Sequence, residues 1–193
     1  MSRKIFIDGG AFTGISIDLF RKQWKDHNEY EIYSFECNPI FEKQIKNRNV
    51  NFINKAIWIK DEELKFYLGT RYGGMGSSLI EKKTSGRLDK QNPIKVNAID
   101  FSQWIIDNFS KDDYIVLKLD IEGAEYEVLN KMMDDESIKY INDFYGEWHQ
   151  QKIGLSKDEH RRIIGRLEEY GLGDMKYWNA EDPDGNKANG VED

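Results

Sequence analysis

Cysteine is almost absent from this chain, since Cys37 is the only one among 193 residues. A single cysteine cannot form a disulfide within the chain, and it excludes a zinc site built on paired cysteines. Long apolar runs are also missing, because none approaches the roughly 20 residues that a membrane-spanning helix needs. The N-terminus MSRKIFID passes from two cations directly into a predicted strand, with no signal-peptide core. We therefore expect a cytoplasmic protein without a membrane span.

An excess of positive charge is the next feature that the sequence lacks. Lysine and arginine number 28 against 35 acidic residues, which gives a net charge of -7. This balance disfavours nucleic acid as a partner. The length and the 39% hydrophobic content are typical of one globular domain. We expect that domain over residues 1–179, followed by a polar, glycine-rich flexible tail over residues 180–193.

Strands and helices alternate along the predicted domain. Strands are predicted over residues 4–8, 31–35, 51–58, 95–99, 114–123 and 140–149, and helices over residues 13–25, 40–48, 101–109, 124–133 and 156–171. The segment ELKFYLG is expected to add an antiparallel strand, and Ser156 with Glu159 predicts a capping box. This alternation predicts an α/β fold with a doubly wound, mostly parallel Rossmann-like sheet covered by helices on both faces.

Acidic residues stand where four of these strands end. Asp8, Glu36 and Asp120 end three strands, and Glu147 stands with His149 at the end of another. Ligands of such folds bind at the carboxyl ends of the strands. Any one of these acids could be only a helix cap or a solvated loop residue, but four at one edge repel each other unless something positive or hydrogen-bonding binds there.

The loop KIFIDGGAFTG after the first strand indicates which cofactor binds. Glu36 follows Gly14 by 22 residues, a distance at which a carboxylate accepts the hydroxyls of a ribose. The dinucleotide fingerprint fails, because Ala11 stands where its second glycine is required. Asp8 would repel a pyrophosphate, whereas it suits a cationic cofactor without phosphates. The loop therefore favours S-adenosylmethionine and methyl transfer over NAD and hydride transfer.

The motifs DGGAFTG, SFECNP, GSSL and KLDIEGAEYEVL together resemble the FkbM family of S-adenosylmethionine-dependent methyltransferases, over residues 5 to 149. The resemblance implies a class I methyltransferase fold that methylates hydroxyl groups of sugars, glycans and related small metabolites. The cofactor-binding residues that we predict are Asp8, Gly9, Gly10, Phe12, Thr13, Gly14, Glu36, Cys37, Ala56, Ser78 and Asp120. No clear strand follows MKYWNA, so we expect a shortened C-terminal hairpin.

Transfer to a hydroxyl needs a base that takes its proton. Our catalytic candidates are His149, Glu147, Glu122 and Lys118. In a strand, residues two positions apart share a face, so Glu147 and His149 are expected to lie together. Lys118 shares the face of Asp120, and we expect it to neutralise the acids rather than to orient substrate.

Two alternatives remain open beside this hypothesis, which includes no metal. Asp120, Glu122 and Glu147 offer oxygen ligands suited to Mg²⁺, as in a divalent-metal-dependent sugar O-methyltransferase. The chain could also be a non-catalytic cofactor-binding module of the same fold.

The polar segment 71–92 is long for a loop within a compact domain. We expect it to close over the cofactor, with Ser77 or Ser78 donating a hydrogen bond into the site.

Overall fold

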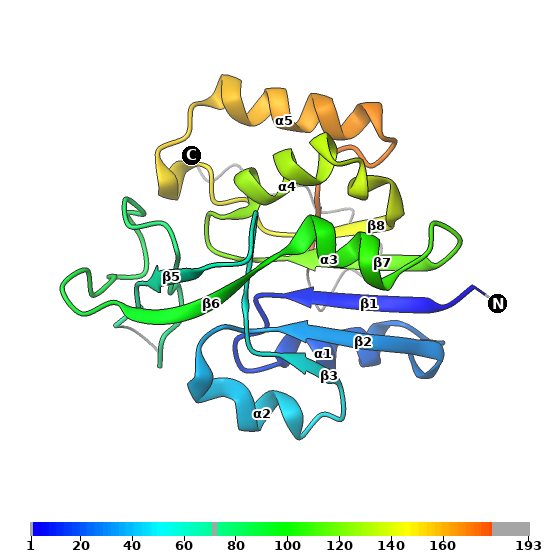
Figure 1. Ribbon diagram of the computed structural model, residues 1–193, viewed down its shortest axis with the longest axis horizontal. Coiled ribbons are helices and arrows are strands. Elements are labelled where there is room, and N and C mark those ends of the chain that lie inside the picture. The colour runs from blue at the N-terminus through cyan, green and yellow to red at the C-terminus, as the bar shows by residue number, and fades with distance from the viewer. Residues whose placement is uncertain (1, 71–72, 179–193) are drawn as a thin grey trace.

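The computed structural model describes residues 2–70 and 73–178, which form an α/β fold around two sheets (Figure 1). The larger sheet runs in the order β3-β2-β1-β7-β8-β9, and its strands pair in parallel. The strands of this sheet are β1 (Lys4–Gly9), β2 (Tyr30–Phe35), β3 (Asn51–Ile53), β7 (Tyr114–Leu119), β8 (Ile141–Gly146) and β9 (Lys176–Tyr177). The predicted fold class is confirmed.

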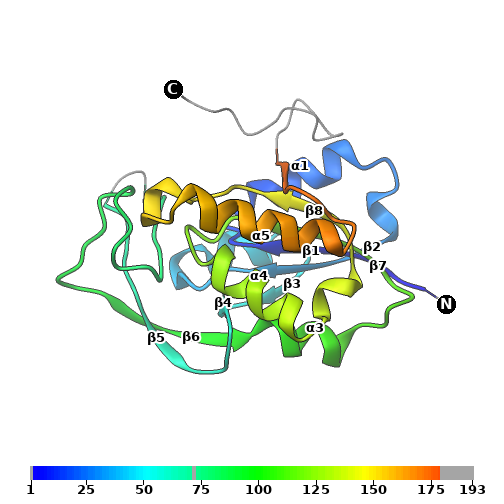
Figure 2. The ribbon, with the colours of Figure 1, turned by 90° about the horizontal axis from the view of Figure 1, so that it is seen from above.

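Helices cover both faces of this sheet. They are α1 (Ile15–Gln23), α2 (Glu42–Lys46), α3 (Phe101–Asn108), α4 (Glu125–Asp134) and α5 (Lys157–Glu169), with short 3₁₀ turns at His27–Glu29, Pro39–Phe41, Ser137–Tyr140 and Gln151–Ile153. Figure 2 shows α1 on one side of the sheet and α3 and α4 on the other. Successive side chains of β1 point to opposite faces of the sheet, which explains this arrangement. Ile5 and Ile7 pack in one core cluster with Leu129 of α4, whereas Phe6 packs in a second cluster with Phe20 of α1.

The smaller sheet has the order β4-β6-β5 and is built from β4 (Ala56–Trp58), β5 (Glu63–Phe66) and β6 (Ile94–Asp100). The antiparallel pairing of β5 with β6 confirms the expectation for ELKFYLG. The prediction of one strand over residues 51–58 is wrong, because the chain turns between β3 and β4 into the second sheet. Asn54 stabilises that turn: its Nδ2 donates to the Glu36 carbonyl at 2.7 Å.

Several further element ends differ from the sequence prediction, among them that of β7, which ends at Leu119 rather than at residue 123. Helix α1 begins at Ile15, because Gly14 adopts a left-handed φ of 82° as its N-cap. Strand β8 ends at Gly146 rather than His149. Gly146 lies so close to β7 that an added Cβ would meet the Leu119 carbonyl oxygen at 1.8 Å, so only glycine fits at the end of this strand. The predicted capping box of α5, between Ser156 and Glu159, is confirmed.

The carboxyl ends of the larger sheet point toward the smaller sheet and the loop that follows β5 (Figure 1). Within this loop, residues 73–92 contain no helix or strand and are held by bridges from Ser78 to Tyr67 and from Leu88 to Gly69. At the other end of the chain, β9 is a short parallel strand, and the predicted tail over residues 180–193 lies outside the described residues. Of the helices in the described part of the chain, none has the length and apolar character to cross a bilayer.

Candidate functional site

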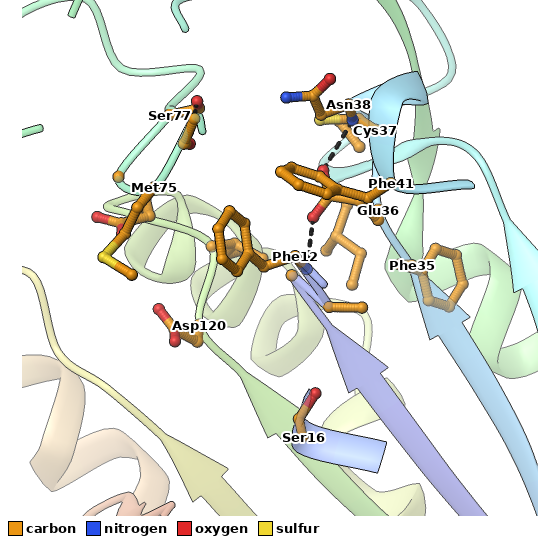
Figure 3. A pocket seen from close by; sticks show the side chains of 18 of the residues that line it. Phe12, Ser16, Phe35, Glu36, Cys37, Asn38, Phe41, Met75, Ser77 and Asp120 are labelled. Atoms are coloured by element: carbon orange, nitrogen blue, oxygen red, sulfur yellow. Dashed lines mark hydrogen bonds between the residues drawn. The ribbon is translucent and has the colours of Figure 1, made fainter. Parts of the chain in front are cut away.

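A cavity of about 470 Å³ opens at the carboxyl ends of β1, β2 and β7 (Figure 3). Its lining includes residues 10–12, 35–38, 55–57, 74–77 and 120–122, together with Lys118, Glu147 and Lys152. Figure 3 shows Met75 and Ser77 across the cavity from Glu36 and Asn38. Three of the acids predicted from strand ends, Glu36, Asp120 and Glu147, therefore line one cavity.

The loop after β1 packs tightly against the ends of its neighbouring strands. The backbone N–H groups of Gly10 and Ala11 donate to the Phe35 carbonyl at 3.1 and 3.0 Å. Gly10 has a φ of 77°, and an added Cβ would lie 1.9 Å from the Asp120 carbonyl oxygen, so only glycine fits there. Phe12 also has a left-handed φ, of 51°, which is uncommon for a non-glycine residue and typical of functional loops.

Glu36 lies at the end of β2 with both carboxylate oxygens fixed. Oε2 accepts from the Phe12 N–H at 2.8 Å, and Oε1 accepts from the Asn38 N–H at 2.7 Å. The residue is only 8% exposed. Burial raises the pKa of Glu36 to about 7, although the two N–H groups oppose the shift. Its remaining lone pairs are available to hydroxyl donors in the cavity.

Asp8 lies behind the cavity instead of lining it, in contact with Lys118. It is fully buried, and its Oδ2 accepts from the Ser16 hydroxyl at 2.7 Å. Lys118 Nζ lies 3.3 Å from Asp8 Oδ1 and donates to the Gly10 carbonyl at 2.8 Å. Burial disfavours the charge of Lys118, but Asp8 and Asp120 outweigh it and raise its pKa. Lys118 therefore pairs with Asp8, and its role at the site remains a prediction.

Asp120, Glu122, Glu147 and His149 form a group that we call the acidic corner. The Nε2 atom of His149 lies 3.2 Å from Glu122 Oε2, 3.7 Å from Asp120 Oδ1 and 3.8 Å from Glu147 Oε1. The three carboxylates line the cavity, whereas His149 is 1% exposed and lies behind them. Glu147 and His149 thus lie together as expected, although neither belongs to a strand.

Glu125, a residue that the sequence analysis missed, fixes the other side of the His149 ring. Its Oε1 lies 3.1 Å from His149 Nδ1 and accepts from the Ile121 N–H at 2.8 Å. Its Oε2 accepts from the Gly123 N–H at 2.9 Å. Glu125 is fully buried at the start of α4. The motif DIEGAE contained this residue, but its place in a helical pattern did not distinguish it from a surface acid.

Mutual electrostatics perturb the pKa values of the acidic corner. Burial alone would lower the pKa of His149, but the carboxylates of Glu122 and Glu125 outweigh burial and raise it to about 10. Burial opposes the charge of Glu122 as well, yet His149 and Lys83 lower the pKa of that carboxyl to about 2. Burial raises the pKa of Asp120 to about 6. A histidine with this pKa holds its proton at neutral pH, which argues against His149 as a free base.

Two lysines that the sequence analysis missed also contact the acidic corner. Lys83 Nζ lies 2.8 Å from Glu122 Oε2 and donates to the Gly76 carbonyl at 2.8 Å. Lys152 Nζ lies 2.7 Å from Glu147 Oε1 and lines the cavity. Lys83 comes from the segment EKKTSG and Lys152 from HQQKIG, and no sequence signal distinguished either lysine from a surface residue.

The other predicted site residues divide by whether they reach the cavity. Ala56, Cys37 and Phe12 line it, and burial raises the pKa of the Cys37 thiol. Gly9, Thr13, Gly14 and Ser78 lie outside its lining. The Ser78 hydroxyl donates to the Glu122 carbonyl at 2.7 Å, so Ser78 anchors the loop, and Ser77 lines the cavity instead. The roles of these residues in cofactor binding remain predictions.

Comparison with known proteins gave one match. The family model described as the methyltransferase FkbM domain matches residues 8–172. The matched segment contains the first loop, Glu36, the acidic corner and α5. Searches of curated proteins and of solved structures returned no match.

Proposed function

The chain belongs to the FkbM methyltransferase family, which matches residues 8–172, and on that premise we propose that it uses S-adenosylmethionine to methylate a hydroxyl group of a sugar, glycan or related small metabolite. The observation that carries the proposal is the position of Glu36. Its carboxylate lines the cavity, held by the N–H groups of Phe12 and Asn38. A carboxylate in this position accepts hydrogen bonds from the two hydroxyls of a ribose.

The remaining lining of the cavity suits the other parts of this cofactor. Ala56 and Ile57 of β4, with Cys37, give an apolar wall beside Glu36 that fits an adenine ring. Asp120 lies among the lining residues as well, and its carboxylate favours the cationic sulfonium and amino groups. When bound, S-adenosylmethionine supplies an electrophilic methyl group.

The Glu147 side of the acidic corner is the part of the cavity that we assign to the acceptor hydroxyl. Methyl transfer to oxygen depends on positioning and on removal of the hydroxyl proton. Glu147 is our candidate base, because it lines the cavity while His149 does not. Lys152, which pairs with Glu147 at 2.7 Å, orients that carboxylate.

Calorimetry of the purified protein against S-adenosylmethionine and against NAD tests the cofactor. We expect micromolar-range binding of the first and none of the second, and binding of NAD alone would overturn the proposal. Incubation with methyl-labelled cofactor and a panel of glycans and sugar nucleotides, followed by mass spectrometry, tests the acceptor. Methylation of a hydroxyl would support the proposal, whereas cofactor binding without transfer to any acceptor would favour a non-catalytic cofactor-binding module.

A further inference from the structure

We propose that the acidic corner binds one divalent first-row metal ion, with Asp120, Glu122 and His149 as its ligands. One carboxylate oxygen from each acid and a ring nitrogen of His149 lie within 4.8 Å of one another. Metal–ligand bonds of roughly 2.1 Å place neighbouring ligand atoms about 3 Å apart and opposite ones about 4.2 Å apart. The distances from His149 Nε2 to Glu122 and Asp120, 3.2 and 3.7 Å, fall within that range.

The second observation is the state of the His149 ring. Its side chain is fully buried, and Nε2 points into the acidic corner without a well-aligned hydrogen bond among the described residues, although Glu122 Oε2 lies 3.2 Å away. Buried polar atoms are rarely left without partners, so an orphaned nitrogen aimed at carboxylates indicates a missing ligand. Glu125 binds Nδ1 from the opposite side at 3.1 Å. A carboxylate on one ring nitrogen fixes the tautomer that leaves the other nitrogen free to bind a metal.

The charge around the site is also unbalanced. Five carboxylates gather here and behind it, from Asp8, Asp120, Glu122, Glu125 and Glu147. Three lysines, Lys83, Lys118 and Lys152, pair with members of this group. A metal ligand must be deprotonated, so binding releases the His149 proton, and the described groups then carry an excess of two negative charges. One divalent cation neutralises that excess, and the carboxylates then bind a charge instead of repelling one another.

The donor set indicates which metal binds. Carboxylates suit Mg²⁺, Ca²⁺ and Mn²⁺, whereas imidazole suits the later transition metals. One imidazole with carboxylate oxygens therefore favours Mn²⁺ over Mg²⁺ or Ca²⁺. His149 lies behind the acids, while Asp120 and Glu122 line the cavity, so the open coordination position faces the cavity. An acceptor hydroxyl oxygen would bind there, an assignment that rests on the proposed function.

The test uses Mn²⁺ alone with the full-length protein after chelator treatment. We expect about one Mn²⁺ per chain in the micromolar range, measured as loss of the free-ion electron paramagnetic resonance signal. Pulsed measurements on the bound ion should show coupling to a nitrogen nucleus, as imidazole ligation requires. Absence of binding up to millimolar Mn²⁺, or a bound ion without nitrogen coupling, would overturn the proposal.

Variants distinguish ligands from structural residues. Asp120→Asn should weaken Mn²⁺ binding roughly 10-fold or more, and His149→Gln should abolish the nitrogen coupling. His160→Gln is the matched control, because that histidine pairs with the Tyr126 hydroxyl at 3.0 Å and is not among the grouped ligands. If circular dichroism shows that His149→Gln does not fold, Asp120→Asn supplies the test, because Asp120 is partly exposed and its replacement should not prevent folding. Unchanged Mn²⁺ affinity in Asp120→Asn would contradict the proposed metal site.

The same samples separate this proposal from the proposed function. Calorimetry with S-adenosylmethionine is repeated with and without Mn²⁺. Cofactor binding by a protein that does not bind Mn²⁺ would remove the metal site and leave the methyltransferase proposal intact. Mn²⁺ binding with nitrogen coupling in a protein that does not bind S-adenosylmethionine would support the metal site and remove the methyltransferase proposal.

Discussion

The backbone N–H of Phe12 donates to Glu36 Oε2 at 2.8 Å, so the loop after β1 and the end of β2 are joined at the edge of the cavity. Phe12 makes this contact in a left-handed conformation, with a φ of 51°. Its ring packs on Phe41, with centroids 4.5 Å apart. The contact orders the carboxylate before any ligand binds, and an ordered group loses less entropy on binding.

Cofactor affinity should therefore depend on Glu36 and on pH. Hydroxyl donors bind the charged carboxylate, so binding requires the deprotonated form. Because burial raises the pKa of Glu36 to about 7, affinity for S-adenosylmethionine should rise as pH increases through that value. At about pH 6 affinity should be roughly 10-fold below its value at about pH 8, as calorimetry at several pH values would show.

The variant Glu36→Gln supplies the control for this prediction. It should lower affinity by roughly 10-fold or more and remove the pH dependence, because charge-assisted hydrogen bonds contribute about 1.5 to 3 kcal/mol. Glu31→Gln, at an exposed position of the same strand, should leave both unchanged. A pH dependence that persists in Glu36→Gln would assign the titration to another group.

Glu125 should contribute to folding stability, because its buried carboxylate binds several groups of the protein. Its carboxylate accepts from two backbone N–H groups and contacts His149. Glu125→Gln replaces one accepting oxygen by a donor and removes a buried charge that faces His149. We expect a loss of about 2 to 4 kcal/mol in the free energy of unfolding, measured with urea.

Glu127→Gln is the matched control for that measurement. Glu127 lies on the same helix but is exposed, so its replacement should change stability by less than about 0.5 kcal/mol. Equal effects of the two substitutions would mean that the Glu125 network adds nothing to stability.

Local sequence patterns predicted the parts of the fold that depend on neighbouring residues. The apolar run before Asp120, the capping box of Ser156 and the alternation of strands with helices are all local signals. The division of residues 51–58 between two sheets could not be predicted in this way, because it depends on Asn54 binding the carbonyl of Glu36, 18 positions away. Pairing across such separations leaves no periodic pattern.

The candidate site shows the same limit. Glu36, Asp120 and Glu147 follow from strand ends, because parallel strands bring those ends to one edge. Glu125 and Lys83 could not be predicted, since each is recognisable only once distant segments pack. His149 was predicted as a site residue, but its burial behind the acids and its contact with Glu125 depend on that packing.

The loop segment 73–78 should respond to cofactor binding. Gly74, Met75, Gly76 and Ser77 line the cavity, and the three glycines of the segment adopt left-handed φ values. Lys83 and Ser78 anchor its end, to Gly76 and Glu122. We expect S-adenosylmethionine to slow amide hydrogen exchange and proteolysis in this segment, because loops of this kind close when ligand binds. The control is the surface helix α5, where exchange should not change. Equal rates in the segment with and without cofactor would show an idle surface loop.

Glu147 should be required for turnover and dispensable for cofactor binding. Its carboxylate lines the cavity, and Lys152 holds one oxygen at 2.7 Å. Glu147→Gln preserves the shape of the side chain but cannot accept a proton, so kcat should fall by roughly 10² to 10⁴ while the affinity for S-adenosylmethionine stays close to wild type.

Asp143→Asn is the matched control and should retain wild-type turnover. Asp143 lies in β8, pairs with Lys176 at 3.0 Å and does not line the cavity. The rates come from methyl-labelled cofactor with the acceptor that the panel identifies. Full turnover in Glu147→Gln would exclude Glu147 as the base.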